Sequence, residues 1–255
     1  MNAPQRASII TGTSMSCEEL FAVPIMPLGL AISPDGAWVG MLYLRAGSYR
    51  LGFFPTVVEQ SPCELALPCG RPGGLNWSPD GQRIAFFADQ GNGSPDANIF
   101  VLDLNSGHFS ALLTEPGWKA FIPSWSPDGT LLAFSAYPVP RPPHLHPRPF
   151  IASLAAGTVR QLTDGRYVDV GPVFMPDGNL AFRRGWDLWL LNLADGGMRP
   201  LAGNIELRLG CCSPDGSRLV VQRNIPDRNQ ALLVDVATGA ETVLSDVNGD
   251  ARAPT

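Results

Sequence analysis

Ser78-Pro79-Asp80-Gly81 and Ser126-Pro127-Asp128-Gly129 are two copies of a four-residue phrase that the chain repeats five times. The other copies begin at Ser33, at Met175, where methionine replaces serine, and at Ser213. Proline presets φ at the second position of a type I turn, and glycine tolerates positive φ at the fourth, so each copy predicts a turn between antiparallel strands. We expect the aspartate of each turn to bond its own backbone; these structural aspartates are Asp35, Asp80, Asp128, Asp177 and Asp215.

The spacing of the repeats predicts the architecture. Successive turn prolines are 38 to 49 residues apart, which suits a four-stranded propeller blade of about 40 to 50 residues. Apolar residues recur at fixed places around each turn, and we expect the residue two before each proline to point inward. This column consists of Ile32, Trp77, Trp125, Phe174 and Cys212.

A second repeated phrase follows each turn and predicts the outer half of each blade. It aligns Gly107, Gly157, Gly196 and Gly239 in hairpins that would join a third strand to a fourth. The first repeat keeps its apolar content over 51–68 but loses the glycine register. The sequence therefore predicts an all-β fold, a β-propeller of four-stranded blades with five recognisable repeats.

The two ends of the chain suggest three segments. We expect an N-terminal segment over 1–27, the β-propeller over 28–245, and a C-terminal tail over 246–255. Residues 250–255 resemble the approach to another turn, so the tail is alternatively the start of an incomplete sixth blade. In the first segment, Ser16-Cys17-Glu18-Glu19 has the spacing of a capping box and indicates a short helix, although a closing strand is the alternative.

Composition excludes several classes of partner. The chain has 255 residues, of which 45% are hydrophobic. Its net charge is −5, so it lacks the excess of positive charge that is typical of proteins that bind nucleic acid or an anionic membrane. No signal peptide or membrane-spanning run is visible, which predicts a cytoplasmic protein, or a periplasmic one if the true N-terminus lies upstream. An unclosed ring would leave a sheet edge through which the chain could self-associate.

The phrase from Trp77 to Phe86, repeated from Trp125 to Phe134, resembles the repeat of TolB-type β-propellers. The same repeat is similar to that of the N-terminal propeller of prolyl-oligopeptidase-type serine peptidases. The segment from Ser16 to Tyr43 also looks like the way those peptidases begin. The resemblance implies a binding propeller or a propeller that gates substrate entry, but a Gly-x-Ser-x-Gly nucleophile elbow does not occur in this sequence.

Few residues point to catalysis or to a metal, and we expect neither an enzyme nor a cofactor. His144 and His146 lie in a proline-rich insertion of the third repeat, which we interpret as a solvated loop because two ligands make an incomplete metal site. Residues 246–250 have calcium-loop spacing but lack the later ligands. We interpret Trp186 and Asp187 as residues of a blade strand that are explained by packing.

Functional residues of a propeller belong in its loops, so the loops that enter the first strand of each blade supply the binding candidates. Aromatic and charged side chains gather there, as on protein-binding surfaces. We therefore expect a non-catalytic scaffold that binds a protein or peptide partner; the alternative is the substrate-gating propeller of a serine peptidase without its α/β-hydrolase domain. The candidates are Arg71, Trp118, Lys119, Tyr167, Asp169, Glu206 and Arg208.

Overall fold

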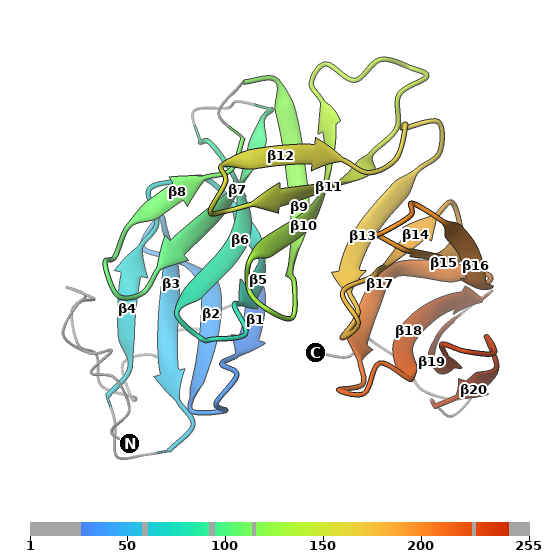
Figure 1. Cartoon of the computed structure of the whole chain (residues 1–255). Coiled ribbons are helices and arrows are strands. Elements are labelled where there is room, and N and C mark those ends of the chain that lie inside the picture. Colours follow the sequence, from blue (N-terminus) through green and yellow to red (C-terminus); the bar gives the residue numbers. More distant parts are fainter. Residues whose placement is uncertain (1–26, 58–60, 92–94, 114–115, 226–227, 245–255) are drawn as a thin grey trace. The chain divides into compact units, whose positions relative to one another are not determined.

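The computed structural model describes residues 27–57, 61–91, 95–113, 116–225 and 228–244, without the side chains of 206–211 and 224–229. These residues form twenty β-strands and no helix (Figure 1). Their contacts divide the chain into two compact units, Met1–Pro123 and Ser124–Thr255. The boundary between the units falls inside one strand, Trp118–Trp125.

The first unit contains two four-stranded blades of antiparallel strands. Blade one has the strand order β1-β2-β3-β4, and blade two pairs β5-β6-β7-β8 in sequence. A single parallel bridge, Ala97 to Lys119, joins β7 to β9, the strand that crosses the unit boundary. The strands are β1 (Gly29–Ile32), β2 (Trp38–Arg45), β3 (Ser48–Pro55), β4 (Cys63–Ala66), β5 (Pro72–Trp77), β6 (Arg83–Asp89), β7 (Ala97–Asp103), β8 (Phe109–Ala111) and β9 (Trp118–Trp125).

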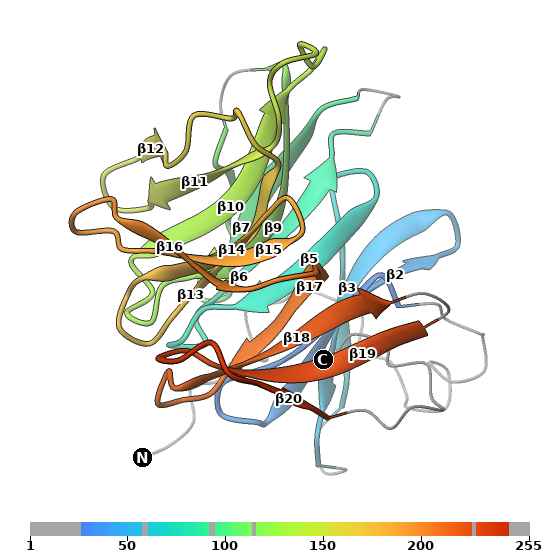
Figure 2. The same cartoon turned by 90° about the vertical axis from the view of Figure 1, so that its right-hand side faces the viewer.

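The second unit completes blade three and contains blades four and five. Blade three consists of β9 to β12, and blades four and five have the sequential orders β13-β14-β15-β16 and β17-β18-β19-β20 (Figure 2). The strands are β10 (Leu131–Pro138), β11 (Arg148–Ser153), β12 (Thr158–Gln161), β13 (Asp169–Phe174), β14 (Leu180–Arg184), β15 (Asp187–Leu191), β16 (Met198–Ala202), β17 (Ile205–Cys212), β18 (Arg218–Ile225), β19 (Arg228–Asp235) and β20 (Glu241–Val243). The all-β fold of four-stranded blades that the repeats predicted is therefore present.

All five repeated turns have the geometry that their sequence predicts. The N–H of each turn glycine donates to the carbonyl of the first turn residue, three positions earlier, as from Gly129 to Ser126 at 2.9 Å. Each of these glycines has a positive φ, 70° at Gly129. The Asp128 carboxylate accepts the Ser126 hydroxyl at 2.6 Å and the Thr130 N–H at 3.0 Å. In the other four turns the aspartate carboxylate likewise accepts the backbone N–H of the residue two positions later. These aspartates are Asp35, Asp80, Asp177 and Asp215.

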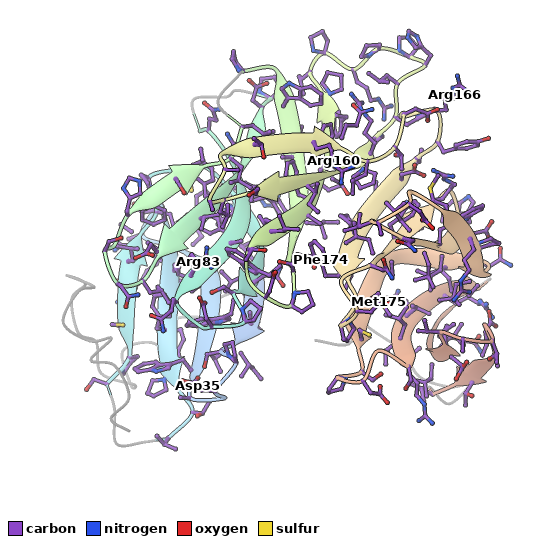
Figure 3. The ribbon with its side chains drawn as sticks, viewed as in Figure 1. Asp35, Arg83, Arg160, Arg166, Phe174 and Met175 are labelled. Atoms are coloured by element: carbon purple, nitrogen blue, oxygen red, sulfur yellow. The ribbon has the colours of Figure 1, made fainter. Side chains whose placement is uncertain are left out.

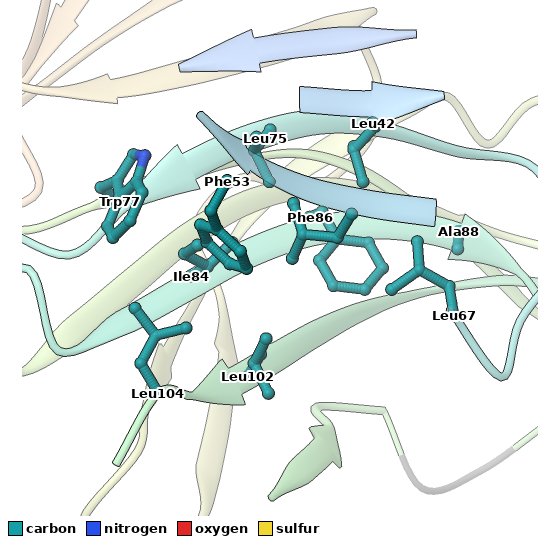
Figure 4. Packing of buried hydrophobic residues seen from close by; sticks show 11 residues of the cluster. Leu42, Phe53, Leu67, Leu75, Trp77, Ile84, Phe86, Ala88, Leu102 and Leu104 are labelled. Carbon is teal, nitrogen blue, oxygen red and sulfur yellow. The ribbon is translucent and has the colours of Figure 1, made fainter. Parts of the chain in front are cut away.

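Blades one and two pack face to face through a continuous apolar cluster (Figure 4). Phe86 and Leu42 are fully buried in it, and Phe53 and Trp77 meet edge to face with centroids 5.8 Å apart. The indole N–H of Trp77 donates to the Ala31 carbonyl of blade one at 3.1 Å. Truncation of a buried aromatic such as Phe86 to alanine costs about 3–5 kcal/mol, so this interface contributes strongly to stability.

The second unit repeats this arrangement twice. Phe174 and Phe182 of blade four pack with Ala133 and Ile151 of blade three. The opposite face of blade four packs on blade five, where the cluster includes Leu188, Leu219 and Val221. In blade four, β14 is apolar on both faces because a blade lies on each side of it: Phe182 packs toward blade three and Ala181 toward blade five.

The predicted inward column is correct for four repeats and wrong for the first. Trp77, Trp125 and Phe174 are buried and Cys212 is half-buried in the cluster with blade four, whereas Ile32 is 66% exposed. The contacts of Trp77 and Phe174 show that residues of this column face the preceding blade. Among the described residues of the first unit no blade precedes blade one, so Ile32 has no such neighbour within that unit.

The other predictions about individual segments have mixed outcomes. The first repeat, despite its lost glycine register, forms a regular blade in which β3 pairs with β4 from Arg50 to Phe53. The proline-rich insertion lies between β10 and β11 as expected. The predicted N-terminal helix or strand over 1–27 and the tail over 246–255 lie outside the described residues, apart from residue 27.

Candidate binding surface

The seven candidates from the sequence are divided between the two units. Arg71 and Lys119 are exposed and Trp118 is half-buried in the first unit, whereas Tyr167 and Asp169 belong to the second. Glu206 and Arg208 are part of β17, but their side chains lie outside the described residues. Tyr167 and Asp169 are therefore the two candidates that the structure places in one local arrangement.

Asp169 is not in a loop, where we expected it as a binding candidate. It is the first residue of β13 and is fully buried. Its carboxylate accepts two hydrogen bonds from Arg184, from Nε at 2.9 Å and from Nη2 at 2.8 Å. These bonds raise the pKa of the Arg184 guanidinium. Asp169 therefore cannot contact a ligand directly and instead fixes the position of Arg184.

Arg184 in turn supports an exposed aromatic ring. Its guanidinium lies 5.0 Å from the ring centroid of Tyr167, and 5.1 Å and 5.5 Å from those of Trp189 and Phe182. These are cation–π distances, and Arg184 is held in place by the buried carboxylate beneath it. Tyr167 is 58% exposed, so its phenol ring is accessible at the surface while Arg184 supports it.

Trp186, which we expected to pack within a strand, forms a second aromatic platform. It lies instead in the turn between β14 and β15 and is 63% exposed. The guanidinium of Arg183 lies 5.4 Å from its ring and also donates to the Gly185 carbonyl. The Trp186 carbonyl accepts the Ile205 N–H at 2.6 Å. Trp186 is thus an exposed aromatic residue with a fixed backbone, and Asp187 beside it is exposed as well.

The two platforms belong to the same end of blade four. The N–H of Gly185 donates to the Val168 carbonyl at 2.9 Å, which ties the turn that carries Trp186 to the loop that carries Tyr167. Register alternation places Arg184 with Phe182 on the side of blade three, and Arg183 with Ala181 on the side of blade five. Tyr167 and Trp186 therefore flank the strand ends, and we call them the aromatic pair.

Charged side chains and the proline-rich loop border the aromatic pair. Arg166 pairs with Asp164 at 3.1 Å and is 83% exposed; Figure 3 labels it in the loop that enters β13. The N–H of His146 donates to the Gly165 carbonyl at 2.9 Å, which connects the loop before β11 to this loop. Gly165 has φ +78°, and a Cβ there would lie 2.9 Å from Arg148, so this close approach requires glycine.

The aromatic pair consists of two exposed rings, each of which lies against an arginine. Exposed Trp and Tyr side chains supply large contact areas and are typical of protein-binding surfaces. His144 and His146 lie in the bordering loop, and the described residues contain no group of three or more His, Cys, Asp or Glu that could hold a metal ion. Within the described residues there is likewise no helix with the length and apolar content of a membrane span.

Comparison with known families agrees with the fold. The profile of the TolB beta propeller domain matches residues 52–255. The chain therefore belongs to the TolB-type β-propeller family.

Individual relatives include both TolB proteins and peptidases. The structure of TolB from Acinetobacter baumannii has a TM-score of 0.69 and 17% identity, over 91% of this chain and 58% of that one. A puromycin-hydrolyzing peptidase from Mycobacterium tuberculosis also has a TM-score of 0.69, with 18% identity, over 87% of this chain and 38% of that one. In sequence, the uncharacterized peptidase YuxL of Bacillus subtilis is 33% identical over 105 residues, which are 40% of this chain and 15% of that protein.

These similarities concern a propeller and not a catalytic domain. The chain spans less than two thirds of the length of each of these relatives. At such low identity the structural likeness shows the fold alone. The resemblance to TolB-type and peptidase propellers that the repeats suggested is thus confirmed, and no catalytic site is shown within it.

Proposed function

We propose that the chain is a non-catalytic binding module that holds a peptide or a protein segment at the aromatic pair. The observation that supports it is that Tyr167 and Trp186 are both more than half exposed while each ring lies against an arginine. Rigid aromatic residues lose little conformational entropy on binding, so they act as anchors. A peptide is favoured because the rings, the ion pair at Arg166 and the proline-rich loop form a mixed apolar and polar surface.

Peptide selection tests this proposal. Peptides selected from a random library on the full chain are measured by calorimetry against wild type, Tyr167→Ala and Trp186→Ala. We expect each substitution to weaken binding by about tenfold or more, as for an interface anchor worth more than about 1.4 kcal/mol. The matched control is Val159→Ala on β12, which removes an exposed apolar side chain elsewhere in the second unit. Peptides that bind all four proteins equally would exclude the aromatic pair as the site.

A second function is the substrate-gating propeller of a prolyl-oligopeptidase-type peptidase. The observation that favours it is the similarity to two peptidases over a minor part of their length. Under this hypothesis the hydrolase domain is encoded separately or follows in a longer form of the gene. Sequencing of the source DNA downstream of the codon for Thr255 tests it: a reading frame with Gly-x-Ser-x-Gly followed by Asp and His supports a gate, and an unrelated gene favours the stand-alone module.

A further inference from the structure

A cavity of about 440 Å³ lies at the other end of blade four, where the chain turns between strands. Pairing of Asp169 with Arg184 and of Phe174 with Leu180 places the aromatic pair and the Met175 turn at opposite ends of the β13–β14 hairpin. In Figure 3, Arg166 lies before the start of β13, and Met175 follows its end. Blades four and five both contribute to the cavity wall, so it is a site separate from the aromatic pair.

The floor of this cavity is apolar. Met175, Leu190, Leu191 and Val236 line it, and Met175 and Leu191 belong to the buried cores of blade four. Met198 at its edge is 42% exposed. Methionine side chains are flexible and polarisable, so they adapt to the aliphatic part of a ligand.

The rim of the cavity is acidic. Asp177, Asp195 and Asp215 line it, and none of them forms an ion pair with any described residue. Arg199 also lines the cavity and directs Nη2 to the Val236 carbonyl at 2.8 Å. Three carboxylates and one guanidinium give the site a net negative charge.

The carboxylates retain the capacity to accept further hydrogen bonds. Asp195 accepts the Gly197 N–H at Oδ1, 2.7 Å away, and its Oδ2 has no donor among the described residues. Asp215 accepts the hydroxyl of Ser213 and the N–H and hydroxyl of Ser217, and these bonds lower its pKa to about 2. Asp215 therefore remains ionised at neutral pH. Each carboxylate has lone pairs left for an incoming donor.

We propose that this cavity binds a lysine or arginine side chain of a peptide segment, with an apolar neighbour of that residue on the floor. The aliphatic stem of a long cationic side chain packs on apolar surface while its charged head reaches polar groups, which matches an apolar floor under an acidic rim. Attraction between the cation and the net negative charge of the rim selects against neutral and anionic peptides. A bare metal ion fits less well, because the described residues do not place three ligating side chains together.

Methyl NMR of the full chain tests this proposal, since two methionines lie at the cavity. The protein is labelled at its methionine methyl groups, and Met175, Met198 and the remote Met41 are assigned with Met→Leu variants. The probes are the capped dipeptides acetyl-Leu-Arg-amide and acetyl-Leu-Gln-amide, which differ in charge. We expect saturable shifts at Met175 and Met198 with the arginine probe, little change with the glutamine probe, and no change at Met41.

Removal of one rim charge gives the second arm of the test. Asp195→Asn keeps an oxygen for the Gly197 N–H but loses the charge, and we expect it to weaken the arginine probe about two- to fivefold, in proportion to one partly exposed ion pair. The matched control is Asp187→Asn, an exposed aspartate at the opposite end of blade four, which should leave the affinity unchanged. The methyl spectrum of each variant without probe verifies its fold. Equal binding of the two probes, shifts at Met41, or no shift at saturation would each overturn the proposal.

Discussion

Arg184 binds the fully buried carboxylate of Asp169 through two parallel hydrogen bonds of 2.9 and 2.8 Å, directly beneath the ring of Tyr167. The arginine thus has two roles. It neutralises a charge at the start of β13, and it presents an exposed aromatic side chain in a fixed position. The stability of blade four and the geometry of the candidate surface consequently depend on the same side chain.

Asp169→Ala should strongly destabilise the protein. The substitution leaves the Arg184 guanidinium, only 14% exposed, without its carboxylate. Removal of one partner from a buried ion pair costs about 3–5 kcal/mol, because the remaining charge stays desolvated. Urea denaturation followed by circular dichroism measures the change in free energy of unfolding.

A nearby ion pair provides the control for that experiment. Arg166 and Asp164 also form an ion pair at 3.1 Å, but the two side chains are 83% and 57% exposed. Exposed pairs contribute about 0–1 kcal/mol, so Arg166→Ala should leave the denaturation midpoint almost unchanged. If both variants lose equal stability, burial of Asp169 does not determine how much its ion pair contributes to the free energy of unfolding.

The serine of the repeated turn should matter more than its aspartate. The buried Ser126 hydroxyl donates to Asp128 and accepts the Leu131 N–H at 2.9 Å, so Ser126→Ala removes both bonds. We expect a loss of about 1–2 kcal/mol, since a backbone donor is left without its partner. Asp128→Ala acts on an exposed carboxylate and should lower the denaturant midpoint by less.

Blade four shows how a turn can dispense with this serine. Met175 stands in its place, and the turn is held by Asn179, whose amide donates to Asp177 and whose Oδ1 accepts the Leu193 N–H at 3.2 Å. Asn179→Ala should therefore destabilise blade four to an extent comparable with that of Ser126→Ala in blade three. A neutral Asn179→Ala would contradict this view of the methionine-containing turn.

The turn aspartates should make stability depend on acid pH. Hydrogen bonds from Ser213 and then Ser217 lower the pKa of Asp215 from 3.8 to about 2. Because the folded-state pKa is the lower one, this contribution to stability is present above about pH 4 and is lost as the pH falls toward 2. Asp215→Asn should show a weaker dependence on pH in this window, measured by denaturant melts at several acid pH values.

Removal of a donor provides an independent check of the acid window. Ser213→Ala takes away the hydroxyl that lowers the pKa of Asp215 most. The variant should lose stability at neutral pH and should also be less sensitive to acid than wild type. Parallel curves for wild type and both variants would mean that Asp215 does not contribute to acid unfolding.

Much of the fold could be predicted from short-range patterns. The turn phrase specifies its own geometry, since proline, aspartate and glycine each satisfy a local requirement, and so the five hairpins followed from the sequence. Ile32 shows the limit of this reasoning. The column identifies which residue faces the preceding blade, but whether a blade precedes is a property of the whole chain and not of the repeat.

The candidate surface was less predictable than the fold. Asp169 and Tyr167 were found because we expected both in the loop that enters β13. Only the position of Arg184 shows that Asp169 is buried beside it and that Tyr167 is exposed. Trp186 was assigned to packing because we expected it inside a blade strand, whereas β15 begins one residue later, at Asp187, and leaves Trp186 in the exposed turn. The Gly185 before it, with φ +61°, was the available signal for a turn.

Tyr43 and Glu64 in blade one should give the protein an alkaline limit to its stability. The Tyr43 hydroxyl donates to the Glu64 carboxylate at 2.5 Å, and both side chains are buried. Arg45 and Arg50 approach the other carboxylate oxygen, each at 3.5 Å. Burial, and then the bond to Glu64, raise the pKa of Tyr43 above its ordinary value of 10.0.

Tyr43→Phe should therefore destabilise the protein below pH 10 and matter less above it. Loss of the donor leaves a buried carboxylate oxygen without this hydrogen bond, which costs about 1–3 kcal/mol. Because the folded-state pKa of Tyr43 is raised, its contribution is present below pH 10 and is lost as the pH rises beyond it, so wild type and variant should converge in alkali. Denaturant melts at neutral and alkaline pH measure this, with Tyr167→Phe on the exposed surface as the control. If the difference between wild type and Tyr43→Phe persists unchanged in alkali, the buried hydrogen bond is not its source.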